Sequence, residues 1–292
     1  MTWIKPNDLR MDECWRIESS QRSAVMFEVL VNIEEMRDDN PVVRTGLALA
    51  SRHDAYAAGL NIVEVFPATM AMPDVMTVLA TQEQMAKQCD AWWMKQCHEH
   101  GIEGVWEVIR GLYVPVLARR SCMADITVSR MPNREAGYST GMDHVTRVLL
   151  AAASPMLLVP SDWDGTFRPE RVLVAWNSTP ESMRALRAAV PFLREAGTVR
   201  LVDGASDELP GIAPPPLPVR DWITRQGIAL QAVQQFPAQT NIGEALLDQA
   251  HAMKADLLVM GAWGHSRVSE LILGGTTRHV LKHAQLPVLL AH

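Results

Sequence analysis

Short apolar segments alternate with amphipathic ones along most of this chain, and the alternation predicts a parallel α/β fold. Strand-length apolar runs recur, and stretches with helical spacing of their apolar residues lie between them. In the C-terminal part we predict strands near residues 171–176, 198–203, 228–235, 256–260 and 287–291. We predict helices near residues 180–195, 217–226, 241–253 and 275–284. Strands separated by helices indicate a parallel sheet that is covered on both faces.

The chain also contains an internal repeat. Residues 124–130 match residues 255–261 at an offset of 131 positions, and the same offset pairs Thr146-Arg147 with Thr277-Arg278. Earlier in each half, residues 29–34 correspond to residues 172–177. A repeat of this length indicates two similar domains rather than a solenoid of small repeats.

The repeat and the breaker residues divide the chain into four segments. We expect an N-terminal extension at 1–23, a first domain at 24–160, a linker at 161–170 that is rich in breaker residues, and a second domain at 171–292. Each domain closes on a short apolar run, at 156–159 and at 288–291. Because an apolar strand at a sheet edge invites association, we expect these two last strands to pair.

Composition narrows the class of protein. The chain has 292 residues, of which 48% are hydrophobic, so each domain can bury a core, and no apolar run has the length of a membrane span. The charged N-terminus predicts no secretion signal, and we expect a cytoplasmic protein with no membrane partner. A formal net charge of −6 without a basic cluster argues against nucleic acid. The four cysteines form no CxxC pair, which argues against a zinc site or a disulfide framework.

A set of glycines marks the second half as the candidate binding region. Gly261 ends a predicted strand, Gly264 follows after two residues, and Gly274-Gly275-Thr276 follows after nine more and begins a predicted helix. Backbone N–H groups and a helix N-terminus at the carboxyl end of a parallel strand form a site that binds phosphates. The spacing is neither that of a P-loop nor that of a dinucleotide motif. A loop that only ends a strand and begins a helix is the alternative.

This pattern resembles the ATP-binding signature of the universal stress protein family, and the resemblance covers nearly all of residues 24–292. It implies an α/β fold with two adenine nucleotide α-hydrolase-like, Rossmann-like domains in tandem, each with a five-stranded parallel sheet, paired as a pseudo-dimer. It also implies ATP with Mg²⁺ as the cofactor. The implied phosphate-binding residues are Gly261, Gly264, Gly274, Gly275 and Thr276, with His265 facing either the phosphates or the solvent. The adenosine end would be held by Asn177 and by the backbone at Ala175 and Val202.

The two halves differ at the residues that the resemblance assigns to the nucleotide. At the offset of 131, the four glycines of the second half fall on Arg130, Asn133, Asp143 and His144. Side chains there would block a close approach of phosphate to the backbone. The family usually has Asp after the first strand, where this chain has Glu34 and Asn177. We therefore expect one nucleotide per chain and a degenerate first domain with a structural or partner-facing role.

These observations favour a cytoplasmic, nucleotide-dependent stress-response regulator that acts through contacts with an unidentified protein partner. Two alternatives stay open: an interaction or dimerisation module that binds no nucleotide, and a slow ATPase. The sequence shows no Ser-His-Asp set, metal-ligand cluster or paired carboxylates, so it nominates no catalytic residue, and the metal ligands are undetermined. Whether the chain forms a further homodimer is also open.

Overall fold

One continuous sheet of ten strands forms the centre of the protein. The computed structural model describes residues 28–69, 74–132, 140–152, 154–164, 167–204, 217–235, 241–262 and 274–292. The strands are β1 (Glu28–Asn32), β2 (Tyr56–Glu64), β3 (Gly104–Gly111), β4 (Ile126–Arg130), β5 (Met156–Val159), β6 (Arg171–Trp176), β7 (Thr198–Asp203), β8 (Leu230–Gln235), β9 (Leu257–Gly261) and β10 (Val288–Ala291). Their order across the sheet is β3-β2-β1-β4-β5-β10-β9-β6-β7-β8.

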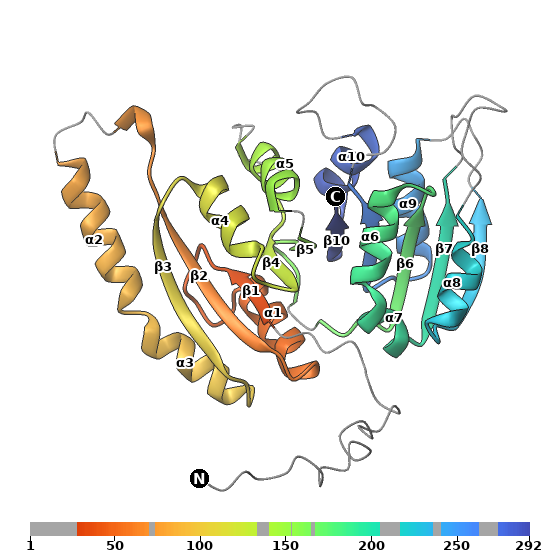
Figure 1. Cartoon of the computed structure of the whole chain (residues 1–292), viewed down its shortest axis with the longest axis horizontal. Coiled ribbons are helices and arrows are strands. Elements are labelled where there is room, and N and C mark those ends of the chain that lie inside the picture. Colours follow the sequence, from red (N-terminus) through yellow and green to blue (C-terminus); the bar gives the residue numbers. More distant parts are fainter. Residues whose placement is uncertain are drawn as a thin grey trace, which may run out of the picture.

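The same arrangement of five strands occurs twice in this order. Residues 28–159 form the first half, whose strands lie in the order β3-β2-β1-β4-β5. Residues 171–292 form the second half, and the equivalent strands lie in the reverse direction across the sheet, as β10-β9-β6-β7-β8. Within each half neighbouring strands are parallel. Figure 1 shows the halves side by side with β5 and β10 between them. The predicted Rossmann-like fold with two five-stranded parallel units is confirmed.

Helices cover both faces of the sheet. They are α1 (Pro41–Arg52), α2 (Val75–Lys87), α3 (Asp90–Glu99), α4 (Tyr113–Ser121), α5 (Thr140–Ala152), α6 (Pro180–Ala188), α7 (Val190–Glu195), α8 (Val219–Arg225), α9 (Ile242–Ala252) and α10 (Gly275–His283), with a short 3-10 turn at Pro67–Thr69. One hydrophobic core lies beneath α1, α3, α6, α7 and α8, and the other beneath α4, α5, α9 and α10. Side chains alternate between the two faces along each strand, so a single strand contributes to both cores.

The last strands of the two halves join the sheet at its centre. β10 pairs antiparallel with β5, with Leu289 opposite Leu157, and pairs parallel with β9 on its other side. Every residue of β5 and β10 is buried. The predicted pairing of the two last strands is therefore confirmed, and β10 is an internal strand rather than an edge.

Two predicted helices are interrupted. The stretch predicted at 180–195 divides at Ala189 into α6 and α7, because Pro191 has no N–H with which to continue the helical ladder. The helical stretch around Trp93 divides at Gln88 and Cys89 into α2 and α3. Trp93 is fully buried, as expected of a core residue, whereas Met85 is exposed.

Candidate functional site

The carboxyl ends of β6, β7 and β9 bring three of the predicted residues to one edge of the sheet. Ala175 of β6 stands opposite Val202 of β7 on one side and opposite Met260 of β9 on the other. Gly261 is the next residue after Met260 and the last of β9. Side-by-side strand ends in an open α/β sheet form the crevice in which such folds bind ligands. Trp176, beside them, is buried in the core, so it packs inside the protein as expected.

Asn177 follows β6 and is held in place by the start of α6. The Thr179 hydroxyl donates to the Asn177 side-chain oxygen at 2.8 Å. Thr179 is itself fixed as the N-cap of α6, because its hydroxyl accepts from the Ser182 N–H and its own N–H donates to the Ser182 hydroxyl. Thr179 was not predicted as a site residue, although Thr followed by Pro180 is a recognisable start of a helix. The network fixes the orientation of the Asn177 amide at the crevice.

Two further residues, Gly204 and Asp203, lie at this edge of the sheet and were not predicted as site residues. Gly204, just after β7, donates its N–H to the Trp176 carbonyl at 2.7 Å. A Cβ atom at Gly204 would stand 3.9 Å from the Asn177 Cβ. The lack of a side chain at Gly204 therefore leaves space beside Asn177. Asp203 precedes it, and burial raises the pKa of its carboxyl group while Arg220 acts in the opposite direction. Only the pairing of β7 with β6 brings these residues next to Asn177.

Gly261 is required for packing. A Cβ atom at this position would stand 2.5 Å from the Ser182 backbone nitrogen and 2.7 Å from the Glu181 carbonyl carbon. Both atoms belong to the first turn of α6, which crosses the end of β9 at this point. Because these are backbone atoms, a side chain could be accommodated only by moving the helix. The glycine therefore has a structural reason to be present that is independent of any ligand.

Gly274 and Gly275 differ from Gly261 in this respect. Among the described residues, no atom lies within 4 Å of the place where a Cβ would stand at either position. Gly274 has φ −54° and ψ 147°, a conformation that any residue adopts, so neither packing nor backbone geometry explains the glycines. As far as the described residues are concerned, which exclude the segment 263–273, the space beside them is open, as a phosphate cradle requires.

The start of α10 has no side-chain cap among the described residues. Gly274 is the N-cap and has no side chain with which to cap the helix, and the first turn contains no acidic residue. It shares the lack of a side-chain cap with α2, α3, α4 and α9, whereas α1 is capped by Asn40 and α6 by Thr179. The first N–H groups of a helix have no partner inside it and carry a partial positive charge. Gly275 and Thr276, at the first two positions of α10, supply such groups.

Gly264 and His265 fall outside the described residues, so their predicted part in the site remains a prediction. Within the described ranges, no group of three or more His, Cys, Asp or Glu side chains is placed to hold a metal ion. None of the helices in the described part of the chain is both long and apolar enough to cross a bilayer.

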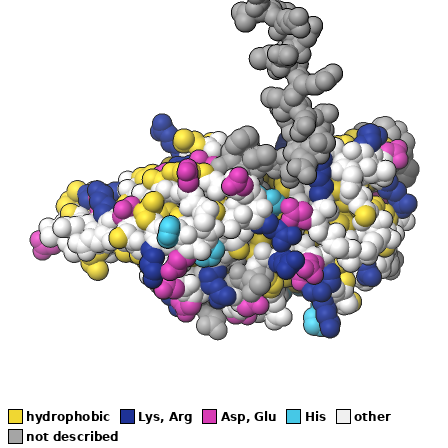
Figure 2. Space-filling view, turned by 90° about the horizontal axis from the view of Figure 1, so that it is seen from below, with side chains coloured by type: hydrophobic (Ala, Val, Ile, Leu, Met, Phe, Trp, Pro, Cys, Tyr) yellow, Lys and Arg dark blue, Asp and Glu magenta, His cyan; other side chains and the backbone are white. Residues whose placement is uncertain are grey.

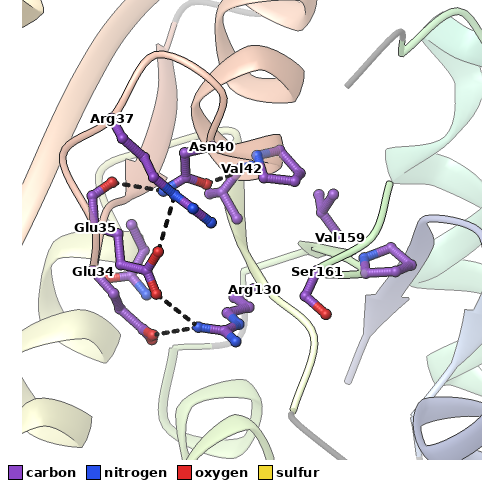
Figure 3. A pocket seen from close by; sticks show the side chains of 11 residues that line it. Glu34, Glu35, Arg37, Asn40, Val42, Arg130, Val159 and Ser161 are labelled. Atoms are coloured by element: carbon purple, nitrogen blue, oxygen red, sulfur yellow. Dashed lines mark hydrogen bonds and ion pairs between the residues drawn. The ribbon is translucent and has the colours of Figure 1, made fainter. Parts of the chain in front are cut away.

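The corresponding edge of the first half is occupied by charged side chains. Arg130 ends β4 as Gly261 ends β9, and its guanidinium lies 3.9 Å from the Glu34 carboxylate and 3.4 Å from that of Glu35. Figure 3 shows these side chains lining a pocket beside Asn40, with Arg37 paired to Glu35. Here eight residues, 33–40, connect β1 to α1, whereas three, 177–179, connect β6 to α6.

The first-half counterpart of α10 is α5, and it begins differently. At the offset of 131, Gly275 falls on His144, which lies four residues inside α5 instead of at its start. The His144 ring stacks on Tyr113 at a centroid distance of 5.2 Å, and the Tyr113 hydroxyl accepts from the Asn32 amide at 2.7 Å. Burial, above all, raises the pKa of Tyr113, so the hydroxyl stays neutral. Aromatic rings thus stand where the second half has open glycines.

Comparisons with known proteins show which family and fold the chain is similar to. Residues 169–292 match the model of the Universal stress protein family. A universal stress protein of Thermus aquaticus is 30% identical over 131 residues, which cover 41% of this chain and 96% of that protein. A second relative, from Synechocystis sp., is 46% identical over 46 residues, but the match spans only 16% of either chain. A crystal structure of a universal stress protein from Archaeoglobus fulgidus has a TM-score of 0.68 at 17% identity, covering 90% of this chain and 95% of that one.

Proposed function

Because this chain belongs to the universal stress protein family, we propose that its second half binds one adenine nucleotide, ATP with Mg²⁺, at the carboxyl edge of β6, β7 and β9. The observation that carries the proposal is the start of α10. Its first N–H groups have no side-chain cap among the described residues, none of which fills the space beside Gly274 and Gly275, and the helix begins on the same edge of the sheet as Ala175 and Val202. Anions bind at such helix N-termini through both the free donors and the helix dipole.

The residues divide into two groups by chemistry. Gly274, Gly275 and Thr276 would donate to the phosphates through backbone N–H groups and the threonine hydroxyl. At the other end, the backbone at Ala175 and Val202 and the Asn177 amide would hold the adenosine. The Thr179 hydroxyl already occupies the Asn177 oxygen, so the amide nitrogen is the group that would donate to the ligand. Gly261, which also has a packing role, completes the proposed set together with Gly264 and His265.

We propose further that ATP acts as a ligand and not as a substrate. A bound nucleotide changes a protein's contacts only through its different affinity for two conformations of that protein. The partner would be another protein, met in the cytoplasm, whose affinity depends on the nucleotide. The Mg²⁺ ion would be held chiefly by the phosphates, since the described residues contain no cluster of three metal-ligating side chains.

One nucleotide per chain is the expected stoichiometry. At the first-half edge, Arg130 and His144 stand at the positions of Gly261 and Gly275, and the Glu34 carboxylate adds negative charge there, so we expect only the second half to bind the nucleotide. Isothermal titration calorimetry with Mg-ATP should give a ratio near one and a dissociation constant on the order of micromolar, or about −8 kcal/mol. A ratio near two would contradict the assignment, and phosphate release from the same samples would identify a slow ATPase.

Valine at Gly274 or Gly275 should abolish nucleotide binding without unfolding the protein. The side chain would enter the open space beside the helix start, where the phosphates are proposed to lie, and the described structure offers no clash of its own. We expect at least about a hundredfold loss of affinity, roughly 3 kcal/mol, because charged hydrogen bonds are lost. Calorimetry measures the affinity, and thermal melting of the free protein should stay within a few degrees of the parent.

Gly197→Val is the matched control for these variants. Gly197 precedes β7 at the opposite edge of the sheet, and a Cβ there would meet only the Glu170 carbonyl, at 3.8 Å. This variant should bind ATP as the parent does. Unchanged affinity in both Gly274→Val and Gly275→Val would show that the loop is a structural turn.

A further inference from the structure

A corner between α1 and α7 forms a second contact between the two halves, away from the β5–β10 ladder. In Figure 1, α1 and α7 lie in the lower part of the two halves, on either side of the centre, and side chains at their ends are in contact. The His53 side chain, which follows α1, is only 3% exposed, and its ring meets Phe192 of α7 edge-on at a centroid distance of 5.6 Å. Phe192 in turn meets Phe167 from the segment between the halves at 5.8 Å. Three rings from three parts of the chain thus close the corner.

Charged groups stand beside this aromatic cluster. The Arg52 guanidinium, on α1, forms a charge-assisted hydrogen bond with Glu195 of α7. The His53 Nδ1 atom lies 4.0 Å from the other carboxylate oxygen of Glu195. Figure 2 shows the face seen from below, on which acidic and basic side chains are interspersed without a large field of either sign. The charged groups that act on the His53 ring are Glu195 and Arg52.

The second nitrogen of the His53 ring decides how the corner responds to a proton. Nε2 is buried and, among the described atoms, has no hydrogen-bond partner. In the neutral ring it can be the nitrogen without a proton. When the ring is protonated, both nitrogens carry N–H groups, and the one at Nε2 would be buried without an acceptor. Leaving a charged donor unsatisfied in an apolar place is costly.

We propose that the α1–α7 corner is a proton-operated latch between the two halves, closed while His53 is neutral and opened when the ring is protonated. The latch can open without unfolding the sheet, because the halves remain joined through β5 and β10. It adds a pH-dependent change in the contact between the halves, whether or not a nucleotide is bound.

The direction of the pH effect follows from the environment of the ring. Burial lowers the pKa of His53 from its ordinary value, Glu195 opposes this, and Arg52 adds to it. The open corner, in which the ring meets water, therefore binds a proton more readily than the closed one. The contribution of His53 to closure is fully present above the ordinary pKa of about 6.5 and is lost as the pH falls below it.

Hydrogen–deuterium exchange on the full chain at pH 7.5 and pH 5.5 tests the proposal. After correction for the intrinsic pH dependence of exchange, protection in the last turn of α1 and in α7 should fall at pH 5.5 by up to about tenfold, the limit for a group with an open-state pKa near 6.5. Protection in α4, which packs on the other hydrophobic core, should not change. Equal protection of the corner at both pH values would overturn the proposal.

Two variants and one direct measurement separate the latch from general acid destabilisation. His53→Phe keeps an aromatic ring in the corner and cannot be protonated, so the pH dependence of α1 and α7 should disappear. His251→Gln, at an exposed position on α9, should retain it. The same pH dependence in His53→Phe would refute the latch. Should that variant fail to fold, NMR titration of His53 in the parent decides, since a pKa at or above 6.5 would also refute it.

Discussion

Gly261→Val should destabilise the folded protein by about 3 kcal/mol or more, the range expected when a side chain is forced into a filled space. The new Cβ would lie 2.5 Å from the Ser182 backbone nitrogen, so the first turn of α6 would have to move away from β9. That turn contains the Thr179 cap that orients Asn177. Urea unfolding followed by circular dichroism measures the change as a shift of the midpoint at constant slope.

Arg130→Val is the matched control in the first half. Arg130 occupies the position equivalent to Gly261, but it already carries a side chain that lies in a pocket and pairs with half-exposed glutamates. Such exposed ion pairs contribute about 1 kcal/mol or less, so this variant should unfold within about that range of the parent. A Gly261→Val protein as stable as the parent would show that α6 does not constrain this position.

This result affects how binding experiments are interpreted. A loss of ATP binding in Gly261→Val would follow from the displaced helix as readily as from a blocked phosphate. Gly274 and Gly275, with open space around them, are therefore the positions that test the nucleotide site itself.

Removing the last strand should prevent the chain from folding cooperatively. A chain that ends before Leu286 lacks β10, whose residues Val288, Leu289 and Leu290 are fully buried between β5 and β9. Each buried aliphatic side chain contributes about 1.5–3 kcal/mol, so the loss approaches the whole stability of a typical domain. It would also leave two apolar strand edges unpaired in the middle of the sheet, which favours aggregation.

Size-exclusion chromatography and thermal melting of the truncated chain provide the measurement. We expect aggregates and no sharp unfolding transition. Deleting residues 1–23 is the matched control at the other terminus, because β1 begins at Glu28 and every described strand is retained. A truncated chain without β10 that is monomeric and unfolds in one cooperative transition would contradict the role assigned to this strand.

The sequence by itself determined the strands of the second half and their order along the chain. The five predicted strands of the second half agree with β6 to β10 within one or two residues, because short apolar runs bounded by turns have few other ways to become buried. The repeat at an offset of 131 aligned Gly261 with Arg130, and both residues end equivalent strands. The pairing of β5 with β10 was also predictable, since both segments are short, apolar and terminal in their halves.

The candidate site could be predicted only in part. The glycines were visible in the sequence, and so was their absence from the first half. The sequence did not show why each position is a glycine. A Cβ at Gly261 would clash with Ser182, nearly eighty positions away in the chain, whereas a Cβ at Gly274 meets none of the described residues. Thr179 contacts Asn177 locally, two positions along the chain, whereas Gly204 joins the site only because β6 and β7 are adjacent.

Tertiary structure alone decided the remaining features. The four-residue extension of α5 places His144 against Tyr113, and no local pattern in either segment announces that contact. The corner at His53 likewise depends on α1 and α7 meeting across the junction of the halves. Local sequence fixes the type of each element through burial and hydrogen bonding within a few residues. Which side chains meet between elements depends instead on strand pairing and packing over long separations, and those contacts determine the space at each strand end.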